Sequence, residues 1–203
     1  MFLKMQFFVS RKSILECGLT LIELMITISI IAILMSLAVP SFQSMTASSN
    51  LTTATNDLVN TLAQARSNAI RRGGRVTVCK SVNGTQCATT GNWEQGWIVF
   101  NDTTKSGTDA NVDTVAGITE AITFTAASQP GGIVINGNLA YISYAADGQT
   151  KQMSGAFQGG TLRVCSTNTS LSNAKRARNL ILTGTGRIVV QAQANVAATC
   201  PAP

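Results

Sequence analysis

The chain has 203 residues, of which 45% are hydrophobic and 12% charged, and its formal net charge is +6. This length suits one domain with an appendage, and it is sufficient to bury a core. Histidine is absent, so the commonest general base and the commonest transition-metal ligand are both missing. The composition therefore disfavours an enzyme, and we expect no metal and no cofactor.

An apolar block, Leu19–Val39, follows a basic N-terminus that contains Lys4, Arg11 and Lys12. As a helix, the 21 residues of this block would extend about 31 Å, which is enough to cross the hydrocarbon core of a bilayer. A secretory signal peptide would have a shorter apolar region followed by a small-residue cleavage site, and Pro40 follows here instead. We predict one membrane-spanning helix with a cytoplasmic N-terminus and the rest of the chain outside.

Glu23 is the only charged residue of this apolar block. A carboxylate at the centre of a bilayer costs about 2.5–3.5 kcal/mol on insertion scales, and less near the end of a span. Such a residue either extends to the membrane interface or has a function. The residues around Glu23 favour the second interpretation.

The segment Gly18-Leu19-Thr20-Leu21-Ile22-Glu23-Leu24 resembles the leader junction of type IV prepilins and pseudopilins. The resemblance implies that prepilin peptidase removes residues 1–18 by cutting between Gly18 and Leu19, and that the new N-terminus is methylated. It also implies that Glu23 pairs with the α-amino group of a neighbouring subunit during assembly. Pro40 lies where many pilins have a helix-loosening proline.

Beyond Pro40 the apolar residues recur at spacings of three and four, which predicts an amphipathic helix. Its predicted buried stripe is Leu51, Ala54, Leu58, Leu62, Ala65 and Ala69. Gly73-Gly74, preceded by Arg71 and Arg72, is typical of a helix C-terminus. We predict a single helix from about Leu19 to Arg72, roughly 80 Å long.

The rest of the chain alternates short β-branched runs with Gly, Asn and Asp, which predicts strands and turns. The expected strands are Arg75–Lys80, Gly96–Phe100, Ile118–Thr125, Gly132–Ile135, Ala140–Tyr144, Thr161–Cys165, Asn179–Thr183 and Arg187–Gln193. Strands after one long helix indicate the α+β class with antiparallel sheets. We divide the chain into a leader (1–18), a transmembrane half-helix (19–40), an amphipathic half-helix (41–74) and a β-rich globular domain (75–203).

This domain resembles one branch of the pilin-like superfamily, the FimT/FimU minor pilins and the GspH pseudopilins. The residues that carry the resemblance are Leu62–Ile70, Val78–Ser81, Trp93–Phe100 and Gly186-Arg187. It implies two β-sheets packed on the helix and a minor pilin that primes or caps a type IV pilus at its tip. The alternative is a GspH-like minor pseudopilin of a type II secretion system.

Family membership also implies a set of partners and a location. The partners would be other minor and major pilins, prepilin peptidase and the inner-membrane assembly platform. The location would be the inner membrane, with a single span and a periplasmic globular domain, followed by the filament.

Removal of residues 1–18 would also remove Cys17 and leave four cysteines, Cys79, Cys87, Cys165 and Cys200. Outside the cytoplasm, four cysteines indicate two disulfides with three possible connectivities. We favour Cys79–Cys87 and Cys165–Cys200, because the first pair encloses a short loop and the second encloses the C-terminal segment of the chain. A metal site is the rival interpretation, which the lack of histidine and of a C-x-x-C motif disfavours.

The segment from Asp102 to Glu120 is a candidate calcium loop. Asp109, Asn111 and Asp113 place oxygen ligands at alternate positions, and Glu120 stands where the last ligand of an EF-hand loop would be. Thr114 replaces the required glycine, and flanking helices are missing, so a solvated polar loop is the favoured interpretation.

A basic set near the C-terminus is a candidate site for double-stranded DNA: Arg163, Lys175, Arg176, Arg178 and Arg187. No acidic residue occurs from Lys151 onward, and such a set could contact phosphates without reading sequence. DNA-binding FimT-type pilins, which act in natural transformation, resemble this with a Gly-Arg-x-Arg motif. The chain has Gly186-Arg187-Ile188-Val189, which lacks the second arginine. A DNA-binding tip subunit and a subunit that acts only through protein contacts both stay open.

Overall fold

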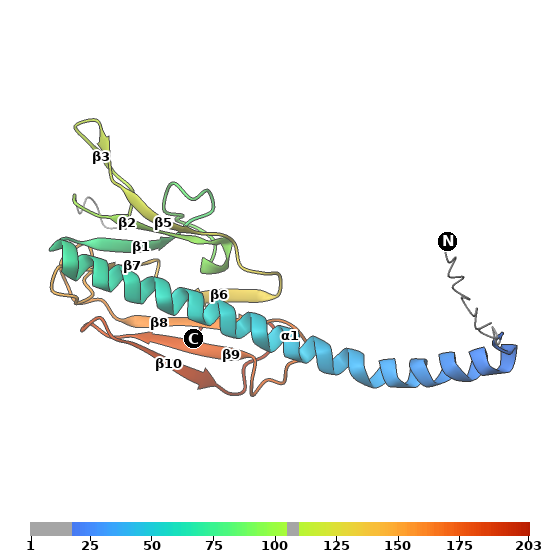
Figure 1. The fold of residues 1–203 in the computed structure, drawn as a ribbon. Helices are drawn as coiled ribbons and strands as arrows, with labels where there is room; N and C mark the ends of the chain where they lie inside the picture. The colour runs from blue at the N-terminus through green and yellow to red at the C-terminus, as the bar shows by residue number, and fades with distance from the viewer. Residues whose placement is uncertain (1–17, 105–109) are drawn as a thin grey trace, which may run out of the picture. The chain divides into compact units, whose positions relative to one another are not determined.

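The computed structural model describes residues 18–104 and 110–203, and the chain divides into two units, Met1–Val39 and Pro40–Pro203. One long helix is followed by strands and a short 3₁₀ helix (Figure 1). In chain order the elements are α1 (Leu21–Arg72), β1 (Val76–Lys80), η1 (Trp93–Gln95), β2 (Trp97–Asn101), β3 (Thr114–Val115), β4 (Ile118–Thr119), β5 (Ile122–Ala126), β6 (Ile133–Gly137), β7 (Tyr141–Tyr144), β8 (Gly160–Ser166), β9 (Ala177–Leu182) and β10 (Ile188–Gln193).

Helix α1 begins two residues later than the sequence predicts. The hydroxyl of Thr20 accepts a hydrogen bond from the main-chain N–H of Glu23 at 3.3 Å, which caps the first turn. The helix continues through Pro40, whose nitrogen has no hydrogen to donate. It ends as predicted, because Gly73 has a φ of 62° and Gly74 donates its N–H to the carbonyl of Ala69 at 3.2 Å.

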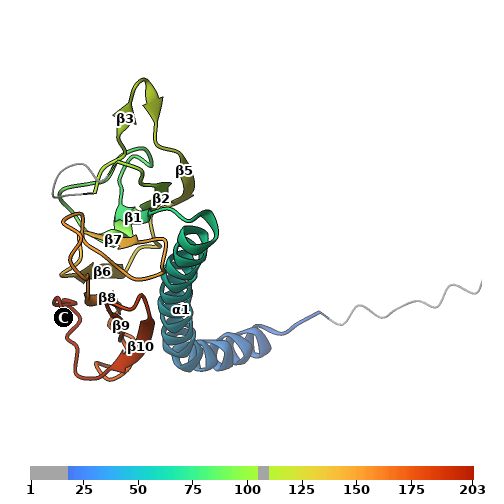
Figure 2. The same cartoon turned by 90° about the vertical axis from the view of Figure 1, so that its left-hand side faces the viewer.

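In the Pro40–Pro203 unit, two four-stranded sheets lie along one side of the helix (Figures 1 and 2). Their strand orders are β5-β2-β1-β7 and β10-β9-β8-β6, and every strand pair in them is antiparallel. Strands β3 and β4 form a separate two-stranded hairpin. The predicted α+β class, with a long helix packed on antiparallel sheets, is confirmed.

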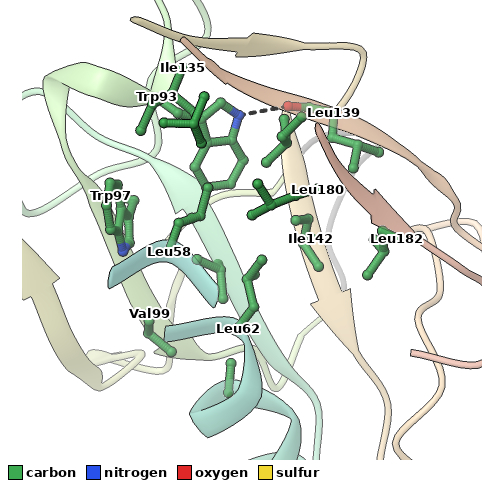
Figure 3. Close-up of a cluster of buried hydrophobic side chains, with 14 of the residues drawn as sticks. Leu58, Leu62, Trp93, Trp97, Val99, Ile135, Leu139, Ile142, Leu180 and Leu182 are labelled. Carbon is green, nitrogen blue, oxygen red and sulfur yellow. Dashed lines mark hydrogen bonds between the residues drawn. The ribbon is translucent and has the colours of Figure 1, made fainter. Parts of the chain in front are cut away.

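The main core lies between α1 and both sheets (Figure 3). All six residues of the predicted helix stripe are buried. They pack against Trp93, Trp97 and Ile142 of one sheet region and against Leu180 and Leu182 of the other. The indole N–H of Trp93 donates to the carbonyl of Leu139 at 2.8 Å, so this large side chain is buried with its polar group satisfied.

The sequence is wrong about the predicted strand Ile118–Thr125, which the structure divides into β4 and β5. Strand β4 pairs with β3 in the hairpin, whereas β5 pairs with β2 at the edge of the first sheet. Between them, Glu120 is buried and its carboxylate accepts hydrogen bonds from the main chain of Thr103, Thr104 and Asp113. The β-branched run is continuous in sequence, but this buried carboxylate interrupts the strand.

Candidate functional site

Gly18 and Leu19 lie just before the start of α1 and are exposed. The rest of the predicted leader, including Glu16 and Cys17, lies outside the described residues. Glu23 lies in the first turn of α1, three residues after the capping Thr20. An acidic residue at this position also interacts favourably with the partial positive charge of the helix N-terminus.

The first half of α1 has the properties of a membrane-spanning segment by length and composition. Its large apolar side chains are exposed in the described chain, from Leu21 (75%) to Val39 (48%). Its hydroxyl groups donate to main-chain carbonyls three or four residues earlier, as Thr27 does to Leu24 and Ser29 to Met25. These hydroxyl groups therefore need no water as a hydrogen-bond partner.

The structure contains two disulfides, Cys79–Cys87 and Cys165–Cys200, which is the connectivity favoured from the sequence. The first holds the loop after β1 against that strand. The second holds the C-terminal segment on the outer face of the second sheet, where Ala177 and Val196 complete a small apolar cluster. Both bonds are thus structural in position.

The candidate calcium loop is only partly described, because Asp109 lies outside the described residues. Both carboxylate oxygens of Glu120 face hydrogen-bond donors, at 2.6 Å for the main-chain N–H of Thr103 and 3.2 Å for that of Asp113. Within the described residues, no group of three or more Asp, Glu, Cys or His side chains is placed to hold a metal ion. Glu120 therefore acts as a structural hydrogen-bond acceptor.

Two members of the predicted basic set, Arg163 and Arg176, are buried and donate hydrogen bonds to main-chain carbonyls. Arg176 is only 3% exposed and donates to the carbonyls of Ser166, Asn168 and Leu171, so it braces the connection between β8 and β9. Arg163 is 9% exposed and holds the C-terminal tail through the carbonyls of Pro201 and Ala202. Their guanidinium groups thus hold the end of β8, the β8–β9 connection and the C-terminal tail in place.

The remaining members of the set do not form one cluster either. Arg178 pairs in register with Ala192, at the end of β10 that is distant from Arg187. Since Leu182 pairs with Ile188, Arg178 and Arg187 are separated by most of the length of the hairpin, roughly 15 Å. Lys175 and Arg187 are exposed, and Arg178 is half-buried.

Arg66, which the sequence analysis did not single out as a site residue, connects α1 to two turns. Its Nε donates to the carbonyl of Gly148 and its Nη2 to that of Thr185, both at 3.0 Å. Gly186 has a φ of 79°, and a Cβ atom there would collide with the Gly148 carbonyl. The turn that contains Gly186 and Arg187 thus lies close to the turn that contains Gly148. Arg66 holds the two turns together.

A groove of about 610 Å³ lies between α1 and the start of β10. We call it the arginine groove. Its lining includes Arg66, Ile70, Arg71, Tyr144, Arg187 and Ile188. The residues come from the helix, from β7 and from the β9–β10 hairpin, so only the folded chain brings them together.

A long helix with an apolar, uncovered first half and a second half packed on two antiparallel sheets defines the chain as a pilin-like subunit. Residues 15–39 match the prokaryotic N-terminal methylation motif, and residues 54–186 match the family described as type II transport protein GspH. The second match covers more than half of the chain. The chain belongs to the GspH family, and it is a minor pilin or pseudopilin of the type IV pilus and type II secretion class.

Solved structures of similar fold are the type IV minor pilin FimU of Pseudomonas aeruginosa strain PAO1 and the type 2 secretion minor pseudopilin EpsH of Vibrio cholerae. Two crystal forms of FimU are 14% and 13% identical, cover 69% and 74% of this chain and 91% and 90% of their own, and have a TM-score of 0.46. EpsH is 10% identical, covers 70% of this chain and 97% of its own, and has a TM-score of 0.43. No curated protein matches the chain by sequence. The family assignment rests on the GspH match.

Proposed function

We propose that the chain is a minor pilin that, once cut between Gly18 and Leu19, assembles at the tip of a type IV pilus and primes or caps the filament. The observation that carries the proposal is an acidic residue in the first turn of an apolar helix whose side chains are uncovered. In a bundle of such helices, the carboxylate of Glu23 can pair with the α-amino group that cleavage creates on a neighbour. The subunit acts through protein contacts rather than catalysis.

The same proposal includes the location and the partners. Before assembly, the first half of α1 anchors the chain in the inner membrane, with the Pro40–Pro203 unit in the periplasm. Prepilin peptidase and the inner-membrane assembly platform act on the chain there. Other minor and major pilins are its neighbours in the filament.

A second candidate function is that of a minor pseudopilin in a type II secretion system. The observation that favours it is the match of residues 54–186 to the family described as type II transport protein GspH. Both functions use the same N-terminal chemistry, and they differ in the filament that incorporates the subunit. Purified pili and pseudopili from the native host, probed separately with an antibody against the chain, distinguish the two.

The experiment that tests assembly replaces Glu23 in the full chain and measures its amount in sheared filaments and in membranes. We expect Glu23→Ala and Glu23→Gln to stay in the membrane but fall about tenfold or more in the filament, the factor that a lost 1.4 kcal/mol produces. Glu23→Asp, which keeps the charge, is the matched control. Because the Thr20 cap uses the main-chain N–H of Glu23, all three variants keep it. Normal incorporation of Glu23→Gln would refute charge pairing.

A further inference from the structure

Positive charge collects in the arginine groove. Arg66, Arg71 and Arg187 line it, and none of its lining residues is acidic. Two of these groups donate hydrogen bonds to neutral acceptors: Arg66 donates to two carbonyls and Arg71 to the side-chain oxygen of Asn68. Three guanidinium groups in a partly enclosed site attract an anion more strongly than they would on an open surface.

A buried hydroxyl adds an independent observation. Tyr144 lines the groove with 0% of its side chain exposed, and its hydroxyl has no hydrogen-bond partner among the described residues. A buried polar group without a partner is unfavourable by about 1–3 kcal/mol. The hydroxyl is protonated at physiological pH, as any tyrosine is, and burial raises its pKa further, so it can donate a hydrogen bond. An acceptor oxygen of a bound ligand would satisfy it once the side chains that cover the hydroxyl move aside.

The groove also has an apolar wall beside a free sheet edge. Ile70, which is 52% exposed, and Ile188, which is half-buried and packs against the main core, both line the groove. Strand β10 is the last strand of its sheet and lies beside α1 (Figure 2). An edge strand with unpaired main-chain groups can add an extended segment of another chain.

We propose that the arginine groove binds an extended acidic segment of a neighbouring filament subunit. The carboxylate of that segment lies among Arg66, Arg71 and Arg187, and an adjacent apolar side chain packs on Ile70 and Ile188. The inference rests on the proposed function, because that function supplies the neighbouring subunit. A nucleic-acid backbone would pair with the arginines but would leave the apolar wall without a partner, so the groove favours a peptide.

The other side of α1 provides a matched control surface. A groove of about 550 Å³ lies there between the helix and β5, and its lining includes Asp57, Gln64 and Phe124. No lysine or arginine belongs to that lining. Ala63 and Gln64 are consecutive, both are exposed, and they line the two different grooves.

The test places the photo-crosslinking residue benzoylphenylalanine at Ala63 or at Gln64 of the full chain, in cells that assemble the filament. We expect the residue at Ala63 to crosslink to a segment of another pilin subunit that contains Asp or Glu, as mapped by mass spectrometry. Arg187→Glu should lower the yield of this crosslink about tenfold through charge repulsion. Arg178→Glu, at the distant end of the hairpin, should leave the yield of the Ala63 crosslink unchanged. Arg187→Glu should likewise leave unchanged the yield of any crosslink formed from the Gln64 position.

A second variant separates binding from folding. Tyr144→Phe removes the unpartnered hydroxyl, so it should lower the crosslink yield without lowering the melting temperature of the full chain. No crosslink at Ala63 in filaments that contain the chain would overturn the inference, as would a crosslink to lipid, to DNA or to a segment without an acidic residue. A yield that Arg187→Glu leaves unchanged would also overturn it. Absence of the chain from filaments would instead contradict the proposed function, which the Glu23 series measures separately.

Discussion

The hydroxyl of Tyr144 lies in surroundings that oppose its ionisation. Burial raises the pKa of Tyr144 above its ordinary value of 10.0, and the positive charge of Arg66 offsets part of this increase. Below pH 10 the hydroxyl is neutral in both the folded and the unfolded chain, so it does not alter stability with pH. Above pH 10 the unfolded chain loses this proton first, and the free energy of unfolding falls as the pH rises.

This shift predicts a difference between the wild-type chain and Tyr144→Phe at alkaline pH. The chain has two tyrosines, so the difference between the phenolate absorbance titrations of the two proteins isolates Tyr144. We expect this difference to develop only above pH 10, and the wild-type chain to lose more stability than the variant between pH 10 and the folded-state pKa. A difference titration centred at pH 10 would show that the hydroxyl is accessible to water.

We predict that a peptidase cuts the chain between Gly18 and Leu19. Both are exposed and precede the helix, so a peptidase can reach the bond between them. Cleavage there would leave 185 residues, Leu19–Pro203, and we expect the new α-amino group to be methylated. Intact-mass analysis of the chain from its native host checks both features, and Gly18→Ala in the same host tests the requirement for glycine at the cut. A cut near Pro40 would indicate a signal peptidase and would contradict the pilin mechanism.

At the level of the secondary-structure elements, the two disulfides stabilise different segments: the loop after β1 and the C-terminal segment. Cys79–Cys87 closes a short loop with a sequence separation of 8, and Cys165–Cys200 closes one of 35 that includes β9 and β10. In the loop-entropy account the first contributes about 2.5 kcal/mol and the second about 4 kcal/mol. Arg163 holds the same C-terminal tail as the second disulfide, so covalent and hydrogen-bonding constraints act together there.

We therefore predict that the processed chain contains no free thiol and that the disulfides differ in importance. Thiol titration of the denatured, unreduced protein should detect none, since cleavage removes Cys17. Replacing both Cys165 and Cys200 with serine should lower the free energy of unfolding more than replacing both Cys79 and Cys87. Two or more titratable thiols would disprove the pairing, and the reverse order of stability would disprove the loop-entropy ranking.

At the scale of the whole molecule, the unit Pro40–Pro203 has a core of its own. Every residue of the main cluster lies between Leu51 and Leu182, and none belongs to the apolar first half of α1. We predict that residues 40–203 fold without the first half-helix and melt within a few degrees of the same unit in the full chain. Thermal denaturation followed by near-ultraviolet circular dichroism, which reports the packing of Trp93 and Trp97, measures this. A molten spectrum for residues 40–203 would show that the unit depends on the rest of the chain.

Charge is distributed unevenly over the same unit. No acidic residue occurs from Lys151 onward, and this stretch forms three of the four strands of the sheet β10-β9-β8-β6. Asp102 and Glu120 belong to the loops around the sheet β5-β2-β1-β7. The grooves on the two sides of α1 also differ in charge, because Arg187 lines one and Asp57 lines the other. A subunit whose two sides carry opposite charge can orient its neighbours, because the basic side of one subunit attracts the acidic side of another.

By itself, the sequence determined the features that depend on neighbours along the chain. The helix stripe from Leu51 to Ala69, the end of α1 at Gly73 and most of the strands follow from periodicity and turn chemistry, which act over a few residues. The junction around Gly18 and the motifs of the domain were sufficient to indicate the family. The spacing of the cysteines favoured the disulfide pairing that the structure contains.

Only the tertiary structure decided which basic residues reach solvent and which side chains meet. Arg163 and Arg176 look like surface cations in sequence, but they are buried and donate hydrogen bonds to main-chain carbonyls around them. Arg178 and Arg187 are close in sequence, yet the register of β9 and β10 places them at opposite ends of a hairpin. The arginine groove joins Arg66, Tyr144 and Arg187, which are distant in the chain, so no local pattern could reveal it.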